Sequence, residues 1–142
     1  MHIQPMTMAD YDAVYALWDA CEGIGLSAGD TREAIQRYLT RNPNMSFVAR
    51  AEDGEVEGAL LCGHDGRRGL LHHLAVRPAS RGRGIGRALV AQALDALRAE
   101  GIDKCHIIVY KENHAGRAFW TAEGWAERVT LVLMSKDIVL GE

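Results

Sequence analysis

The sequence has little cysteine and no long apolar run. Its three cysteines, Cys21, Cys62 and Cys105, are odd in number and far apart, and no Cys-x-x-Cys pair occurs. This pattern argues against a disulfide framework and against a structural zinc site. No segment approaches the roughly 18 consecutive apolar residues of a membrane span. We therefore expect buried, free cysteines in a reducing compartment, no metal and no membrane partner.

An excess of positive charge is also missing. Lys and Arg number 16 against 19 Asp and Glu, so the formal net charge is -3, which argues against a protein that binds nucleic acid through bulk electrostatics. No apolar signal region follows Met1, and we expect a cytoplasmic protein. A chain of 142 residues that is 48% hydrophobic can bury one core, so we expect a single domain over residues 1–142.

Hydrophobic periodicity and turn residues predict alternating strands and helices. Strands are expected over residues 1–5, 45–51, 56–64, 69–76 and 105–110, with a final antiparallel pair over 125–128 and 130–137. Helices are expected over residues 8–22, 31–40, 85–100 and 114–122. The single clear β-α-β crossover places strands 69–76 and 105–110 parallel to each other. The order β-α-α-β-β-β-α-β-α-β-β indicates an α/β class, an α+β mixed sheet with helices on its faces.

The most informative segment is Arg81-Gly82-Arg83-Gly84-Ile85-Gly86-Arg87-Ala88, which lies between an apolar strand and a helix. Glycine allows the backbone to approach a ligand, and the first turn of a helix leaves N–H groups that favour a phosphate. The segment lacks the Gly-Lys-Ser/Thr ending of the phosphate-binding P-loop. It also lies too late in the chain for the dinucleotide fingerprint. A glycine-rich turn with solvated arginines is the alternative to an anion site.

Two separated motifs resemble one family. The segment 81–86 fits the R/Q-x-x-G-x-G/A signature of the GNAT superfamily, the GCN-type-related, acyl-CoA-dependent N-acetyltransferases. The later signature N-x-x-A-x-x-L-Y-x-x-x-G-F is matched in part by Asn113, Phe119, Trp120, Gly124 and Trp125. The segments 17–21 and 63–69 resemble a small branch called YpeA-like. The resemblance covers nearly the whole chain and implies a GNAT-like fold with a splayed central sheet.

The resemblance implies acetyl-CoA as cosubstrate and an amine as acceptor, either a protein N-terminus, a lysine or a small amine. It places the cofactor's diphosphate on main-chain N–H groups of the loop, and its pantetheine arm along a bulged central strand and a later helix. A donor N–H near Val76 would steady the developing oxyanion. The implied cofactor-binding residues are Leu74, Ala75, Val76, Arg81, Gly82, Arg83, Gly84, Ile85, Gly86, Arg87, Ala88, Asn113, Phe119 and Trp120.

Direct acyl transfer needs a base that accepts a proton from the amine. An acid that protonates the departing thiolate also helps the reaction. Trp120 stands where the family has a tyrosine, and Tyr110 is a candidate to replace that acid. A packed aromatic at a strand end is the alternative for Tyr110. The candidate bases are His72 and His73, since imidazole titrates near neutrality. Adjacent strand residues face opposite sides, so we expect only one of them to point at the acceptor. A histidine hydrogen-bonded beside the sheet is the alternative for each.

Two other functions are compatible with the residues. One is a non-catalytic acyl-CoA-binding sensor or interaction module, and the other is a nucleotide-binding regulator that uses the same loop. The glycine-rich segment 23–29 is either a lid over the acceptor or an exposed turn. Relatives that pair through their late strands suggest a homodimer. The acceptor itself is not readable from the sequence.

Overall fold

The computed structural model of the chain describes residues 1–141. The chain separates into two compact units, residues 1–110 and residues 111–142, and each is described by itself. None of the helices within the described residues is both long and apolar enough to cross a membrane.

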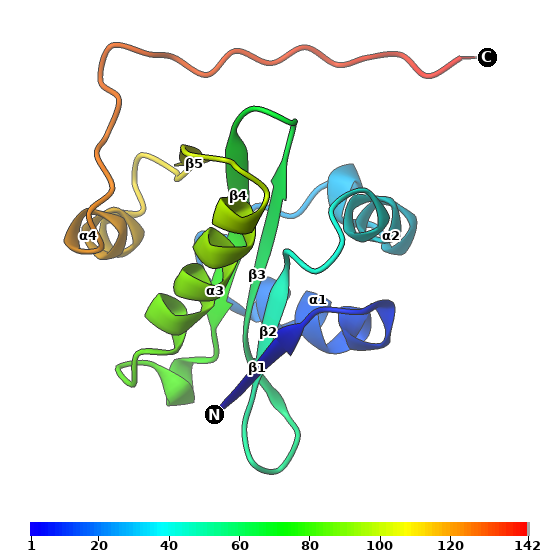
Figure 1. Ribbon diagram of the computed structural model, residues 1–142, viewed down its shortest axis with the longest axis vertical. Coiled ribbons are helices and arrows are strands. Elements are labelled where there is room, and N and C mark those ends of the chain that lie inside the picture. The colour runs from blue at the N-terminus through cyan, green and yellow to red at the C-terminus, as the bar shows by residue number, and fades with distance from the viewer. Residues whose placement is uncertain (142) are drawn as a thin grey trace. The chain divides into compact units, whose positions relative to one another are not determined.

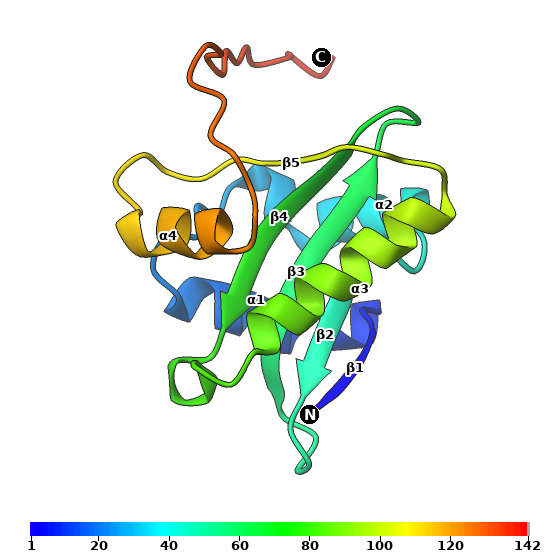
Figure 2. The same ribbon diagram turned by 60° about the vertical axis from the view of Figure 1, so that its left-hand side comes forward.

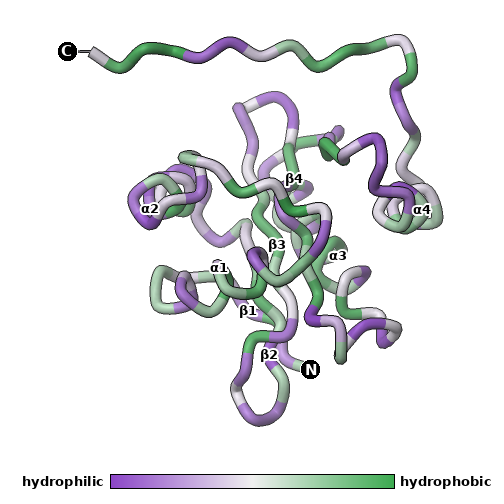
Figure 3. Tube along the Cα trace, turned by 180° about the vertical axis from the view of Figure 1, so that it is seen from behind, coloured by the Kyte–Doolittle hydropathy of each residue, from purple (hydrophilic) through white to green (hydrophobic). Residues whose placement is uncertain are grey.

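The first unit is built around a five-stranded mixed sheet (Figure 1). Its strands are β1 (His2–Pro5), β2 (Phe47–Arg50), β3 (Val56–His64), β4 (Gly69–Val76) and β5 (Cys105–Ile107), in that spatial order. Neighbours are antiparallel except β4 and β5, which run parallel as the crossover predicts. The two predicted hairpin connections are present, and Figure 3 shows the one between β3 and β4 as hydrophilic.

Helices cover both faces of the sheet. Helices α1 (Tyr11–Ala20) and α2 (Arg32–Arg41) lie on one face, and α3 (Ile85–Ala99) lies on the other (Figure 2). Thr31 caps the start of α2, because its side chain accepts the Ala34 N–H at 3.2 Å. A short 3-10 turn, Met8–Asp10, precedes α1 and forms the first part of the predicted helix 8–22.

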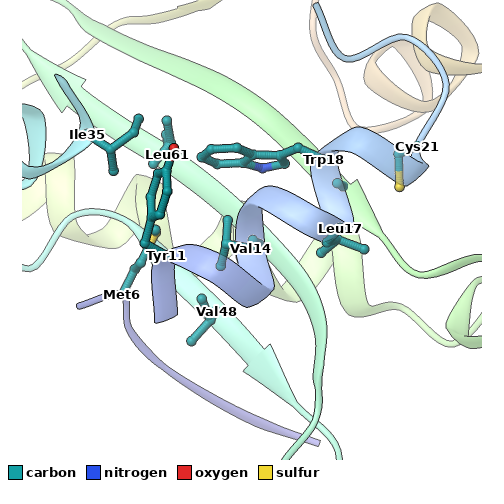
Figure 4. Packing of buried hydrophobic residues seen from close by; sticks show 11 residues of the cluster. Met6, Tyr11, Val14, Leu17, Trp18, Cys21, Ile35, Val48 and Leu61 are labelled. Atoms are coloured by element: carbon teal, nitrogen blue, oxygen red, sulfur yellow. The ribbon is translucent and has the colours of Figure 1, made fainter. Parts of the chain in front are cut away.

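The largest buried cluster joins α1 and α2 to the sheet. Val14 and Trp18 of α1 are completely buried, and Ile35 of α2 lies beside Tyr11 (Figure 4). Ala59, Leu61 and Ala75 supply the sheet side of the same cluster. Burying side chains of this size is the main favourable term for folding, so the cluster fixes α1 firmly on β3 and β4.

The three cysteines are free, as expected from their spacing. Cys21 and Cys62 are buried as expected, whereas Cys105 is only partly buried. Burial raises the pKa of Cys62 to about 12 and that of Cys105 to about 11. A thiol with so high a pKa carries almost no thiolate at neutral pH, so Cys62 and Cys105 have the character of small apolar side chains.

The second unit contains one helix, α4 (His114–Ala122), with the bounds expected from the sequence. The predicted antiparallel pair over 125–128 and 130–137 is wrong: no strand is assigned to residues 125–141. An extended segment becomes a strand only when its backbone groups pair with a neighbour, and this segment has no pairing partner among the strands of the described chain. Its apolar side chains are exposed instead, at 87% for Val129 and 90% for Leu140.

Candidate functional site

The central sheet opens on one side of β4. Strands β4 and β5 pair only at Gly69, Leu70 and Leu71, whereas β4 continues to Val76. Residues 72–76 therefore have no strand partner on the β5 side within the described chain. A backbone edge of this kind offers N–H and C=O groups to an extended ligand. The predicted residues Leu74, Ala75 and Val76 all lie on this edge.

A bulge interrupts β4 at the same place. Ala59 pairs with Ala75 and Leu61 with His72, so a single β3 residue stands opposite His73 and Leu74. His73 has φ +55°, in the left-handed region that few non-glycine residues adopt. The family resemblance implies a strand that is bulged at residues 74–76, and the structure has the bulge at residues 73–74. A bulge turns a strand and re-aims its side chains, which makes it a common feature beside functional sites.

The bulge overturns the prediction that His72 and His73 face opposite sides of the sheet. The His73 ring packs edge-on against Trp18 of α1, with centroids 5.0 Å apart. The His72 ring packs edge-on against Tyr38 of α2 at 6.0 Å, and the two imidazoles lie 6.2 Å apart. Strict alternation holds only for regular strand dihedrals, and the positive φ of His73 breaks it. Both imidazoles therefore lie on the face that α1 and α2 cover.

His73 is held by a buried carboxylate that the sequence could not place. Nε2 of His73 lies 2.8 Å from Oδ1 of Asp30, and the Asp30 side chain is 8% exposed. The other oxygen of Asp30 accepts the Ser27 N–H at 3.0 Å, and its carbonyl accepts the Tyr11 hydroxyl at 2.6 Å. Because an ionised carboxylate only accepts hydrogen bonds, this contact places the ring proton on Nε2 and leaves Nδ1 as the basic nitrogen.

The carbonyl of the bulge is fixed from α1. Nε1 of Trp18 donates to the carbonyl oxygen of His73 at 3.1 Å. Trp18 is completely buried, so its indole N–H needs an acceptor inside the protein. The sequence indicates only that Trp18 belongs to the core. Its hydrogen bond adds a second role, since it holds the strained backbone of the bulge in place.

His72 has a different environment from His73. Burial lowers the pKa of His72 from its usual 6.5, the neighbouring His73 lowers it further, and Asp30 opposes both effects. His72 is therefore neutral at pH 7. Its ring forms no hydrogen bond within the described residues.

The glycine loop offers a row of main-chain donors. Gly82 and Gly84 both have φ +80°, and a Cβ placed on either would meet no atom within 4 Å. Gly84 is the residue before α3, and the Ala88 N–H donates to its carbonyl at 3.0 Å. Within residues 1–141, the N–H groups of residues 82–86 have no hydrogen-bond acceptor. Open donors at a helix N-terminus are a suitable site for a phosphate.

A buried carboxylate, Glu57, contacts the loop from beneath. It was not predicted from the sequence. Glu57 is 3% exposed, and one of its oxygens lies 3.1 Å from the Ser80 hydroxyl and 3.4 Å from the guanidinium groups of Arg77 and Arg83. Its carbonyl accepts the Arg77 N–H at 2.8 Å. The signal in the sequence is an acid at the start of an otherwise apolar strand. These contacts anchor the residues before the loop, and Arg83 within it, to β3.

The arginine side chains of the loop are not simply solvated. Arg83 is directed to Glu57, and Nε of Arg81 donates to the Val76 carbonyl at 2.9 Å. Arg81 therefore ties the loop to the end of β4. This arrangement leaves the main-chain N–H groups, rather than the guanidinium groups of these two residues, as the open donors of the loop.

Tyr110 lies against the connection between α1 and α2. A Cβ built on Gly25 would come within 2.0 Å of the Tyr110 hydroxyl, so only glycine permits this approach. Ile24 and Leu26 of the same connection pack against the buried cluster of α1 and α2. Tyr110 is 57% exposed. Tyr110 follows the end of β5 at Ile107, and its role as the acid stays a prediction beside the packed aromatic.

Three further predicted residues, Asn113, Phe119 and Trp120, lie in the second unit. Asn113 is the residue before α4, and its side chain accepts the Gly116 N–H at 2.9 Å. Phe119 and Trp120 pack edge-on at 5.1 Å, and Trp120 packs on Trp125 at 5.0 Å. Trp120 is 7% exposed. Within residues 1–141, no group of three His, Cys, Asp or Glu side chains is arranged to hold a metal ion.

Comparison with known proteins identifies this arrangement. The Acetyltransferase (GNAT) family model matches residues 11–125. A protein of Pectobacterium atrosepticum named acetyltransferase ECA0875 is 36% identical over 115 residues, which cover 81% of this chain and 80% of that protein. Acetyltransferase SG1711 of Sodalis glossinidius is 30% identical over 139 residues, which cover 98% of this chain and 96% of that protein.

Solved structures agree in fold. Ard1 from Thermoplasma volcanium has a TM-score of 0.77 at 19% identity, over 88% of this chain and 82% of that one. A PaiA N-acetyltransferase from Thermoplasma acidophilum, solved with coenzyme A, has a TM-score of 0.73 at 18% identity, over 87% of both chains. The mixed sheet, the bulged strand and the family match agree with each other. This chain belongs to the GNAT family of acyl-CoA-dependent acetyltransferases.

Proposed function

We propose that this protein transfers an acetyl group from acetyl-CoA directly to the nitrogen of an amine acceptor. The observation that carries the proposal is the bulged, open edge of β4, with the imidazole of His73 on one side and the open N–H groups of residues 82–86 beyond its end. The acetyltransferase names of the relatives favour this enzyme over a non-catalytic sensor.

The residues of the loop fit the diphosphate of the cosubstrate. The donors of residues 82–86 are unpaired, the surface above Gly82 and Gly84 is open, and Glu57 fixes the loop from beneath. The main chain of Leu74, Ala75 and Val76 would hold the pantetheine arm, and an N–H near Val76 would receive the oxyanion. By the family resemblance, Asn113, Phe119 and Trp120 would contact the same arm.

Acetyl-CoA supplies an acetyl group activated as a thioester. In the proposed mechanism, Nδ1 of His73 accepts a proton from the amine, directly or through one water, as the new C–N bond forms. Asp30 acts as a positioning residue, since its hydrogen bond to Nε2 fixes the tautomer and stabilises the imidazolium. The Tyr110 hydroxyl is the proposed donor of a proton to the sulfur as the C–S bond breaks.

His72 is the second candidate base. Its lowered pKa keeps the ring neutral at pH 7, which is the form a base needs, but no carboxylate is bonded to it. The pair with Asp30 therefore favours His73. The YpeA-like branch, the cytoplasmic location, the single domain and the homodimer stay predictions from the sequence.

The test of the proposal is a pair of measurements on the full-length protein. Calorimetric titration should show that CoA binds, and an assay of thiol release from acetyl-CoA should show acceleration by at least one member of a broad amine panel. Binding of CoA without any amine-dependent thiol release would favour the sensor instead. Binding of ATP or NAD in place of CoA would favour the nucleotide-binding regulator.

A further inference from the structure

A hollow of about 310 Å³ lies on the α2 face of the sheet, beside the point where β4 and β5 separate. Tyr38 and Arg41 of α2, His72 of β4 and His106 of β5 contribute to its lining, and Arg68 reaches it from the β3–β4 hairpin. This volume is at the lower end of the range for ligand pockets, which is enough for a small molecule or one side chain. Of these residues, only His72 belongs to the site described above.

The hydroxyl of Tyr38 lies buried at this hollow without a partner. Its oxygen is shielded from solvent and makes no hydrogen bond to any group in residues 1–141. A buried donor left unpaired is costly, so such groups are uncommon in folded proteins. The position is made possible by Gly63, because a Cβ there would lie 2.7 Å from the Tyr38 oxygen.

Positive charge predominates around the hollow. Arg41 and Arg68 are permanent cations, and Asp65 is the acidic residue of the lining. A second acid, Glu100, lies outside the lining, 3.3 Å from the ring of the lining residue His64. The Asp65 carboxylate already accepts the Arg67 and Arg68 N–H groups at 2.8 Å, within its own turn. Arg68 lies 3.3 Å from the exposed Asp103, whereas Arg41 has no ion pair within the described chain. The hollow is therefore suited to a negatively charged group.

We propose that this hollow binds an anionic group, a carboxylate or a phosphate, carried by the amine acceptor. The proposal rests on the proposed function, since it assigns a class of acceptor to the same site. Arg41 and Arg68 supply the charge, and the Tyr38 hydroxyl and the His106 ring supply hydrogen bonds. His72 connects the hollow to the proposed base, because its ring lines the hollow and its centroid lies 6.2 Å from that of the His73 ring.

The experiment compares matched amines that differ in the anionic group. The carboxylate pair is β-alanine and β-alaninamide, and the phosphate pair is phosphoethanolamine and ethanolamine. Each KM is measured with wild-type protein, with Arg41→Gln and with Arg68→Gln. The control is Arg37→Gln, an exposed arginine on the same helix that does not line the hollow. Comparing ratios between variants removes the effect of differing amine basicity.

We expect wild-type protein to prefer the anionic member of one pair, and Arg41→Gln to reduce that preference by about tenfold or more. The KM for acetyl-CoA should not change, and Arg37→Gln should match wild type. The pair that responds identifies the anion as carboxylate or phosphate. Equal use of charged and neutral members, or a preference that survives in both Arg41→Gln and Arg68→Gln, overturns the proposal while the acetyltransferase reaction stands.

A binding measurement separates this proposal from the proposed function. The ring resonances of His72 and His106 are followed by NMR while phosphoethanolamine or β-alanine is added without acetyl-CoA. Shifts in wild-type protein that disappear in Arg41→Gln support the hollow as an anion site even if no amine is acetylated. The absence of any shift up to millimolar ligand overturns it, whatever the result of the thiol-release assay.

Discussion

Replacement of His73 tests the chemistry most directly, and the structure dictates how to replace it. Alanine at φ +55° would keep the backbone strain of roughly 1–2 kcal/mol that a residue with a Cβ carries there, and it would lose the side-chain contacts that hold histidine in this conformation, which would mix a folding defect with a catalytic one. Glycine adopts this conformation freely, and asparagine tolerates it well. His73→Gly and His73→Asn therefore remove the imidazole while they keep the bulge.

Loss of a general base lowers turnover by about 10²–10⁴, which corresponds to about 3–5 kcal/mol in the activation free energy. Loss of the hydrogen bond to the buried Asp30 should lower the free energy of unfolding of His73→Gly by about 1–3 kcal/mol. Steady-state thiol release gives kcat and both KM values, and urea denaturation gives the stability. The KM for acetyl-CoA should stay unchanged, since the loop that binds it is intact.

Added imidazole provides the decisive control. In His73→Gly the space of the lost ring is free, so imidazole in the buffer should restore part of the turnover, whereas His72→Asn should show no such rescue. Full turnover in His73→Gly would refute the assignment and leave His73 with only a structural role.

Four further results are expected. Gly84→Val should abolish CoA binding in calorimetry and cost roughly 1–2 kcal/mol in stability, because valine is strained at φ +80° and covers the open donors; retained affinity contradicts the loop site. Glu57→Gln should weaken CoA binding and lower the free energy of unfolding by about 1–3 kcal/mol, since it removes the charge that holds two arginines beneath the loop; unchanged affinity would make its role purely structural. Gly25→Ala should displace the Tyr110 ring and lower kcat as much as Tyr110→Phe does, and if neither variant changes kcat, Tyr110 is not the acid. The pKa of His72 is lowered from 6.5, so the unfolded chain binds the proton first and stability falls as the pH drops below 6.5 toward the folded-state value; His72→Asn should reduce this fall between about pH 7.5 and about pH 5.5 in chemical denaturation.

The elements with strong local signals were predictable. Strands β3 and β4 have the bounds expected from their apolar runs and turn residues, and α4 begins directly after Asn113 and ends before Gly124 as expected. The glycine loop was visible because glycines before a helix leave a local signature. These features depend on neighbours in the sequence, so one sequence is enough to find them.

The relation between His73 and Asp30 was not predictable in the same way. The two residues are 43 positions apart, and their contact depends on how α1 and α2 pack on the sheet. The orientation of the two histidines was predicted wrongly, because alternation assumes a regular strand and the bulge adds one residue. A bulge at histidine has no dependable sequence signal, whereas one at glycine often has.

The last strands were predicted from apolar composition alone. Residues 129–140 are rich in Val, Leu and Ile, and Figure 3 shows apolar stretches along this part of the trace, but their side chains are exposed and they join no strand of the sheet within the described chain. Composition indicates that a segment can form a strand, whereas pairing requires a neighbouring edge. The hollow on the α2 face of the sheet was also missed, since Tyr38, His72 and His106 come from three separate elements.

The indole of Trp18 has a practical consequence through its bond to the carbonyl of the bulged residue. The emission of an indole depends on what its N–H contacts. If the His73 carbonyl moves when a thioester binds along the open edge of β4, the fluorescence of Trp18 changes. Replacing Trp120 and Trp125 by phenylalanine leaves Trp18 as the single tryptophan of the chain. The Trp18 emission spectrum then reports the binding of acetyl-CoA continuously, without a radioactive or chromogenic label.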